Sequence, residues 1–159
     1  MPESYAAADD AYCYPNSTVL RNLKDLRSSE ELERFETAMA SQRAEELLPA
    51  GQFDVEHYCA IHHHLFQDVY EWAGQPRTVR IEKGPSVFCY PENIEGQMNV
   101  LFSGLRERNF FRELPREPLV DALASFLATL NAIHPFREGN GRTGFCQLDC
   151  ARSRSSAQP

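Results

Sequence analysis

The stretch His134-Pro135-Phe136-Arg137-Glu138-Gly139-Asn140-Gly141-Arg142 decides the fold, because a helix must end at it and a polar, glycine-rich loop must follow. Apolar residues at helical spacing precede it and predict a buried helix: Leu119, Val120, Leu123, Phe126, Leu127, Leu130 and Ile133. Pro135 ends this helix, and the residue before a proline is disfavoured in the α conformation. His134 is therefore expected at the helix end, with its imidazole facing a loop rather than the core.

The loop contains groups that bind phosphate. Gly139 and Gly141 allow the backbone to approach a ligand closely, and with Asn140 they are expected to present successive N–H groups to an anion. This holds especially if a new helix starts near residues 140–143. Arg142 offers a planar fork that binds phosphate oxygens. The alternative is a plain helix-terminating turn, in which these residues have only structural roles.

Two other loop residues suit the chemistry of phosphate transfer, and a third suits an anchor. His134 has an unperturbed pKa near working pH, so its neutral imidazole can take a proton from an attacking hydroxyl. Glu138 is a hard oxygen ligand of the kind that Mg²⁺ uses when it is bound to phosphates. Phe136 is apolar and is expected to anchor the turn in the core. The loop therefore predicts a phosphate-transfer site.

These nine residues resemble the signature of the Fic family, His-Pro-Phe-x-(Asp/Glu)-Gly-Asn-Gly-Arg-x-x-Arg. Tyr12-Cys13-Tyr14-Pro15 and the run from Ile61 to Gly74 are also similar to bacterial Fic proteins of the cell-filamentation type. The resemblance covers residues 12–142. Phe145 stands where the signature has its second arginine, and the sequence after Thr143 no longer resembles the family.

The resemblance divides the chain into three parts. Residues 1–11 are expected to be a flexible leader, residues 12–143 a Fic-like domain, and residues 144–159 a divergent or truncated tail. The fold class is mostly α, a single domain with one small β-hairpin.

The resemblance implies a protein adenylyltransferase that moves AMP from ATP to a Ser, Thr or Tyr hydroxyl of a target protein and releases pyrophosphate. His134 would then be the catalytic base and Glu138 the ligand of Mg²⁺. The residues that bind the ATP phosphates would be Gly139, Asn140, Gly141 and Arg142. Two alternatives stay open: an impaired Fic remnant that only binds proteins, and a Doc-like protein kinase, which the Glu-Gly-Asn-Gly sequence disfavours.

A β-hairpin is predicted because residues 78–81 and 87–90 flank a turn at Lys83-Gly84-Pro85. In Fic proteins the corresponding flap docks a segment of the target by main-chain pairing, to which an exposed strand edge is suited. The alternative is a structural connector. The expected flap consists of Ile81, Glu82, Lys83, Gly84, Pro85, Ser86, Val87 and Phe88.

Capping signals and periodicity locate the other helices. Ser28 with Glu31 predicts a helix that runs to about Leu48. Its inward residues are expected to be Leu32, Phe35, Met39 and Leu47. Asp54 caps a second helix, with a buried stripe that extends to Trp72 and with Gly74 as the residue after its end. A further helix is predicted from Ile94 to near Asn109.

Composition limits the remaining possibilities. The 159 residues carry a net charge of −7, which argues against binding to nucleic acid or anionic membranes. No apolar run is long enough to span a membrane, and residues 1–5 lack the features of a secretory signal. We therefore expect a cytoplasmic protein with reduced cysteines, and delivery into another cell by a secretion system stays open.

The histidine triplet His62-His63-His64, with His57, suggests metal binding, but consecutive helical residues point about 100° apart, which favours hydrogen-bonded structural roles.

Fic proteins are often inhibited by a helix with the pattern (Ser/Thr)-x-x-x-Glu-(Gly/Asn). The nearest string here, residues 29–34, ends in the wrong residue. Inhibition, if present, is expected from a small separate antitoxin.

Overall fold

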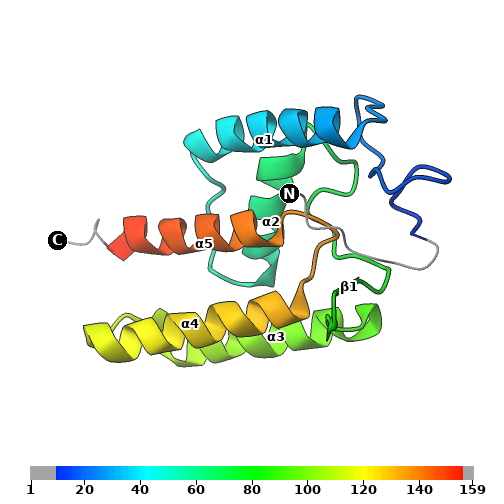
Figure 1. Cartoon of the computed structure of the whole chain (residues 1–159). Helices are drawn as coiled ribbons and strands as arrows, with labels where there is room; N and C mark the ends of the chain where they lie inside the picture. The colour runs from blue at the N-terminus through cyan, green and yellow to red at the C-terminus, as the bar shows by residue number, and fades with distance from the viewer. Residues whose placement is uncertain (1–9, 156–159) are drawn as a thin grey trace.

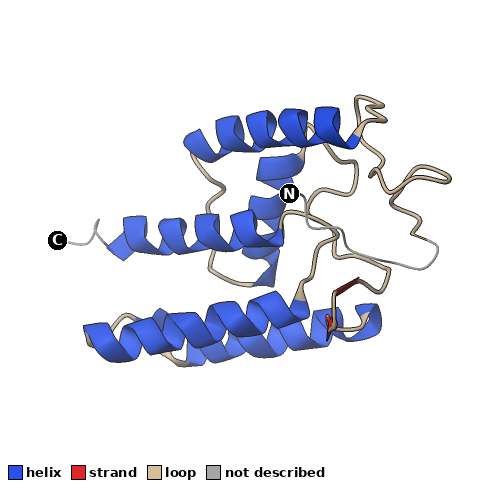
Figure 2. Cartoon of the chain, viewed as in Figure 1, coloured by secondary structure: helices blue, strands red, loops and turns tan. Residues whose placement is uncertain are grey.

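The computed structural model describes residues 10–155, with the backbone alone for 152–155. Within this range the chain forms five α-helices and one small hairpin, which lies at the edge of the helices near the start of α3 (Figures 1 and 2), and this confirms the mostly helical fold class. The helices are α1 Ser29–Glu45, α2 Val55–Phe66, α3 Pro91–Glu107, α4 Arg116–Ile133 and α5 Asn140–Ser155. A single 3₁₀ turn, Asn109–Phe111, follows α3. Residues 1–9 of the expected leader lie outside the described range.

Helix α2 is the centre of the arrangement. It packs against α1 on one side and against α3 and α5 on others, while α4 contacts both α3 and α5. Figure 1 shows α5 running between α1 and α4, with α2 crossing these helices. The end of α4 and the start of α5 therefore come together beside the hairpin, and the loop of residues 134–139 joins them.

The predicted caps of the first two helices are confirmed. The Ser28 hydroxyl accepts a hydrogen bond from the Glu31 N–H, and the Asp54 carboxylate accepts one from the His57 N–H at 2.9 Å. Helix α1 nevertheless ends at Glu45, three residues before the expected end, because the backbone of Glu46 turns to an extended conformation. The expected burial of Leu47 is wrong, since its side chain is 96% exposed.

Helix α2 is also shorter than predicted. It ends at Phe66, and turns occupy the residues up to Gly74, with Val69 and Tyr70 both bonded to the Phe66 carbonyl. Val69 is fully buried, so the inward stripe is partly confirmed although its last members are not helical. Gly74 has a φ of 82° and donates its N–H to the His62 ring at 2.8 Å, so it does not terminate α2.

The hairpin has the predicted turn but much shorter strands. Strand β1 is Glu82–Lys83 and strand β2 is Ser86–Val87, paired antiparallel. The strands expected at 78–81 and 87–90 are therefore wrong in extent. The reason is that the carbonyls of Val79 and Cys89 accept hydrogen bonds from the Arg77 guanidinium, so they bind an arginine instead of N–H groups of an opposite strand.

The core consists of two apolar clusters with α2 between them. One lies between α1 and α2 and includes Leu32, Ile61, Leu65, Phe66, Val69 and Tyr70. The other lies among α2, α3 and α4 and includes Tyr58, Ile94, Met98, Phe102, Phe126, Leu130 and Phe136. Phe136 is completely buried and stacks on Tyr58 and His62, with ring centroids 5.5 and 3.8 Å apart. Its expected role as an anchor is confirmed.

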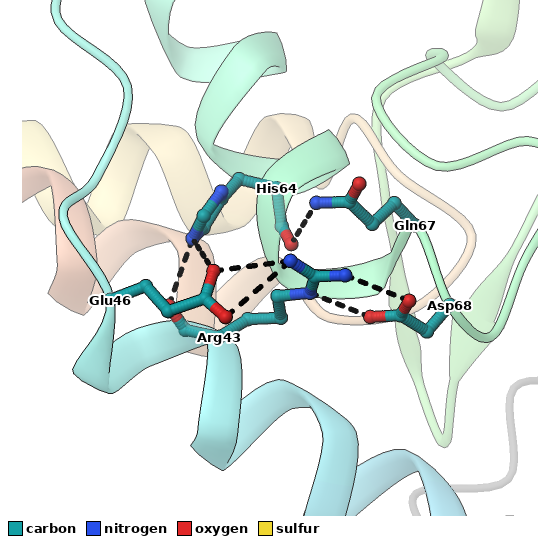
Figure 3. A network of polar contacts seen from close by, with 5 residues as sticks. All are labelled: Arg43, Glu46, His64, Gln67 and Asp68. Carbon is teal, nitrogen blue, oxygen red and sulfur yellow. Dashed lines mark hydrogen bonds and ion pairs between the residues drawn. The ribbon is translucent and has the colours of Figure 1, made fainter.

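A polar network fixes the end of α1 on α2 (Figure 3). Arg43 binds both carboxylate oxygens of Asp68, at 2.7 and 2.9 Å, and also contacts Glu46 at 3.1 Å. His64 lies 2.9 Å from the Arg43 carbonyl and 3.5 Å from Glu46. The hydrogen bonds from Arg43, and to a lesser extent its charge, hold the pKa of Asp68 below its usual range. Among the described residues, no helix is both long enough and apolar enough to cross a bilayer.

Candidate active site

His134 is the C-cap of α4. Its backbone is left-handed, with φ 51° and ψ 63°, and its N–H donates to the Leu130 carbonyl at 2.9 Å. The imidazole stacks on the ring of Phe88, with centroids 4.0 Å apart, and Nδ1 lies 3.3 Å from the Asn131 carbonyl. The imidazole therefore faces the segment after the hairpin, as expected, but it is covered, since His134 is only 5% exposed.

The surroundings of His134 keep its imidazole neutral. Burial, together with the weaker effect of the positive charges of Arg77, Lys83 and Arg137, lowers its pKa to about 4. The hydrogen bond with the Asn131 carbonyl opposes this shift. At neutral pH the ring is therefore in the protonation state that can accept a proton.

The loop after His134 is held in shape by Asn140. The Asn140 side chain accepts from the Phe136 N–H at 2.9 Å and donates to the Phe136 carbonyl at 2.8 Å. Gly139 has a φ of 79°, and a Cβ there would lie 2.3 Å from the Phe66 ring. Only glycine fits at this point.

Helix α5 begins at Asn140, within the range expected from the sequence. The N–H and the hydroxyl of Thr143 both donate hydrogen bonds to the Gly139 carbonyl, at 3.1 and 2.7 Å. The first N–H groups of a helix have no acceptor within it and form a positive end that suits an anion. The predicted phosphate site therefore coincides with the N-terminal turn of α5, from Asn140 to Arg142.

Glu138 is a largely buried carboxylate beside this turn. Its Oε1 accepts from the Gly139 N–H at 2.9 Å. Burial raises the pKa of Glu138, and the nearby charge of Glu36 raises it further, while the Gly139 hydrogen bond and Arg142 and Arg137 oppose the shift. The negative charges of Glu138 and Glu36 together favour a cation at this position.

Arg142 reaches across to α1. Its guanidinium forms an ion pair with Glu36, and Glu36 also accepts a hydrogen bond from the Tyr70 hydroxyl. The same guanidinium lies 4.8 Å above the Phe66 ring. Glu36 was not predicted as a site residue, although its spacing from Leu32 and Ala40 places it on the inward face of α1.

Arg137, the variable position of the motif, has a structural partner near the start of the chain. Its Nε and NH2 groups donate to one oxygen of Asp10 at 2.9 and 2.6 Å. Both side chains are buried, with 5% and 9% exposed. Neither residue was predicted to have a role, because no local pattern identifies a pair separated by 127 positions. Asp10, within the expected flexible leader, is thus fixed to the loop of residues 134–139.

His62, on helix α2, forms a hydrogen bond with the main chain of the loop. Its Nδ1 accepts from the Gly74 N–H, so Nε2 carries the proton and donates to the Glu138 carbonyl, both at 2.8 Å. Burial lowers the pKa of His62 to about 3. The other histidines of this region, His57, His63 and His64, also bond to main-chain carbonyls, which confirms the expected structural roles.

The flap, residues 81–88, combines exposed and buried residues. Its inner end is anchored, because Ile81 is 1% exposed and Phe88 covers His134, whereas Val87 on strand β2 is 60% exposed. The two strands of the flap are exposed along their length.

Comparisons with known proteins agree on the family of this site. Residues 52–149 match the profile of the Fic/DOC family, a range that includes the whole motif and extends beyond Thr143. The chain is 51% identical over 140 residues to "Probable protein adenylyltransferase y4lH" of Sinorhizobium fredii, covering 87% of this chain and 73% of that protein. It is 39% identical to protein adenylyltransferase VbhT of Bartonella schoenbuchensis, covering 87% of this chain but 30% of that larger protein.

A solved structure shares the fold. It is the N-terminal Fic domain of a VirB-translocated Bep effector protein of Bartonella quintana with bound ADP, and it superposes with a TM-score of 0.75 at 26% identity. The superposition covers 88% of this chain and 75% of that one.

Proposed function

This chain belongs to the Fic/DOC family, and from that premise we propose that it is a protein adenylyltransferase, which transfers AMP from ATP to a side-chain hydroxyl of a target protein. One observation carries the proposal: the motif from His134 to Arg142 is unbroken and folds into a loop that joins a covered histidine to the N-terminus of a helix. Relatives named protein adenylyltransferases favour this reaction over the kinase alternative.

The chemical step is a displacement at the α-phosphorus of ATP. A bond forms between the target hydroxyl oxygen and the α-phosphorus, and the bond from that phosphorus to the oxygen bridging the β-phosphate breaks. Pyrophosphate leaves with the electron pair of that bond. The hydroxyl proton moves to the imidazole of His134, which is neutral at working pH because its pKa is depressed to about 4.

The phosphates of ATP are proposed to lie at the first turn of α5. The N–H groups from Asn140 to Arg142 supply fixed donors, and Gly141 leaves the approach to them open, since nothing lies within 4 Å of a Cβ built there. The guanidinium of Arg142 adds positive charge at the same turn. Positioning and electrostatic stabilisation then account for most of the catalysis, as in other phosphoryl transfers.

Glu138 fits the requirements of a Mg²⁺ ligand. Its carboxylate is largely buried close to a second carboxylate, and its pKa is raised, so a cation beside it would relieve an unfavourable charge. Mg²⁺ commonly uses one or two protein carboxylates together with substrate phosphates. When bound, it would neutralise charge on the phosphates that leave. Glu138 itself would hold the ion and, through Gly139, keep the loop in place.

The flap is proposed to dock the target. Its strands β1 and β2 are exposed, and a peptide that paired with one edge would lie beside Phe88 and therefore beside His134. We also propose that the protein acts in a cytoplasm and that any inhibitor is a small antitoxin. Such a partner could not contact the arginine that the family signature has at this position, because this chain has Phe145.

Radiolabelled ATP tests the proposal. The protein is incubated with a bacterial lysate, Mg²⁺ and ATP labelled at either the α- or the γ-phosphate, and proteins are separated on a gel. Label from the α-phosphate alone is expected on a lysate protein, and it should disappear with His134→Ala. Label from the γ-phosphate would identify a kinase, and α-label that survives in His134→Ala would remove His134 from the mechanism.

A further inference from the structure

Arg77 is a buried arginine beside the catalytic histidine that the reaction does not use. It is 2% exposed, and its guanidinium donates four hydrogen bonds to main-chain carbonyls. Two of these carbonyls, Val79 and Cys89 at 2.7 and 2.6 Å, lie on either side of the flap. The other two, His134 and Ile133 at 2.8 and 3.2 Å, form the end of α4.

The backbone around Arg77 repeats this connection. The Arg77 N–H donates to the Pro135 carbonyl at 2.8 Å, and the Cys89 N–H donates to the Ala132 carbonyl at 3.1 Å. Both ends of the flap are thus attached to the last turn of α4 and to the first residues of the catalytic loop. One side chain contacts all of these segments.

The bond to His134 has a particular effect. His134 has a left-handed backbone, which costs free energy for a residue with a side chain, so the surroundings must maintain it. Its carbonyl would otherwise be one of the unpaired groups at the end of a helix. By accepting from Arg77, that carbonyl fixes the peptide plane from which the His134 side chain projects.

From this geometry we propose that Arg77 is a positioning residue, which holds the flap and the imidazole of His134 as one rigid unit. The proposal rests on the proposed function: a target segment docked on the flap would then present its hydroxyl at a constant distance from the base. A flap that moved independently of His134 would dock targets without aligning them.

The chemistry of the arginine fork explains the residue type. Three guanidinium nitrogens in a fixed plane reach four carbonyls, two beside the flap and two at the end of α4. The compact ammonium group of a lysine cannot match this arrangement. The guanidinium also contributes charge, since with Lys83 and Arg137 it opposes protonation of His134, against the pull of the Asn131 carbonyl. Lysine would keep the charge and lose the fork, whereas glutamine loses both.

Three variants separate these contributions. Arg77→Lys and Arg77→Gln are compared with Arg34→Gln, which removes an exposed charge from the outer face of α1. Amide hydrogen exchange is measured for Phe88 and Cys89, the His134 pKa is followed by NMR, and AMP transfer is measured at saturating ATP. Circular dichroism identifies the variants that fold.

Both Arg77 variants are expected to exchange the amides of Phe88 and Cys89 at least tenfold faster, with AMP transfer reduced at least tenfold. The His134 pKa should rise more in Arg77→Gln than in Arg77→Lys, because only glutamine removes the charge. Arg34→Gln should match the parent in every measurement. Unchanged exchange at the flap in a folded Arg77→Lys protein overturns the proposal.

Exchange in the unmodified protein decides the question if both variants unfold. At low denaturant, the amides of Arg77, Cys89 and His134 should open together with one free energy, as a single cooperative unit. Separate opening of the flap and of His134 overturns the proposal. These readouts do not depend on catalysis, so absence of AMP transfer in the parent protein would contradict the proposed function and leave the exchange result to decide the role of Arg77.

Discussion

The ring of Phe88 lies on the imidazole of His134, with their centroids 4.0 Å apart and their planes 22° from parallel. An apolar ring from the end of the flap thus covers the proposed base. Burial is the largest cause of the depressed pKa of His134. The flap therefore determines both access to the base and its protonation.

Removal of this cover should shift the pH dependence of activity. Phe88→Ala exposes His134 to water, so its pKa should rise from about 4 toward the ordinary value near 6.5. A higher pKa means that the base is protonated at a higher pH, so the acid limb of the activity profile should move upward. NMR titration of the His134 ring checks this directly. Identical titration curves in the parent and the variant would show that Phe88 does not set the pKa.

Glu138→Gln should remove the dependence of nucleotide binding on Mg²⁺. Glutamine keeps the size of the side chain and can still accept from the Gly139 N–H, but it lacks the charge that binds a metal ion. Calorimetry with ATP in Mg²⁺ and in EDTA measures the difference. If the unmodified protein binds ATP equally well in both solutions, the assignment of Glu138 as metal ligand fails.

Phe145→Arg should increase AMP transfer. Phe145 lies on α5 one turn beyond Arg142 and is 69% exposed, so an arginine there is accommodated without repacking. A charge-assisted contact with phosphate contributes about 1.5–3 kcal/mol, or roughly ten- to a hundredfold in productive binding. Val100→Arg adds the same charge at an exposed position on α3 and serves as the control. Equal activity of the two variants would contradict this prediction.

His62 should make stability fall in acid. Its pKa is about 3 in the folded protein and about 6.5 when unfolded, so the unfolded state binds one more proton between these values. Stability is then fully present above pH 6.5 and decreases toward pH 3, by at most about 1.4 kcal/mol per pH unit for this group. In His62→Gln the urea midpoint should depend less steeply on pH. Parallel curves for the two proteins would remove His62 as a cause.

Two aspartates that pair with arginines should differ sharply when changed to asparagine. Asp10→Asn removes the carboxylate that pairs with the buried Arg137 charge and should cost about 3–5 kcal/mol. Asp25→Asn breaks a pair with Arg27 that is mostly exposed, and the midpoint of urea unfolding should stay where it is. Equal effects of the two changes would mean that burial does not decide the contribution of the pair.

Local signals in the sequence predicted the helices and the site motif well. The caps at Ser28 and Asp54 depend on residues three positions apart, and the helix before His134 depends on periodicity, so both can be recognised in a short stretch. The helix ends were less accurate. Helix α2 stops at Phe66 although its apolar spacing continues, because the residues beyond it reach the same core through turns.

The partners of the site residues could not be predicted in the same way. Arg77, Glu36 and Asp10 each contact the motif from more than 50 positions away. Nothing in the neighbourhood of Arg77 indicates that it is buried, and only the position of Glu36 on the inward face of α1 gave a usable signal. Tertiary contacts, rather than local propensity, hold the catalytic loop in shape.

The ion pair between Asp10 and Arg137 also bears on how the protein is made. Synthesis proceeds from the N-terminus, so Asp10 emerges long before its partner, 127 positions later, exists. Contacts between distant parts of a chain form late in folding, because a large loop must close before they contribute. The loop of residues 134–139 can thus acquire this support only after Arg137 has been synthesised, and a growing chain on the ribosome that ends before Arg137 carries an unassembled centre.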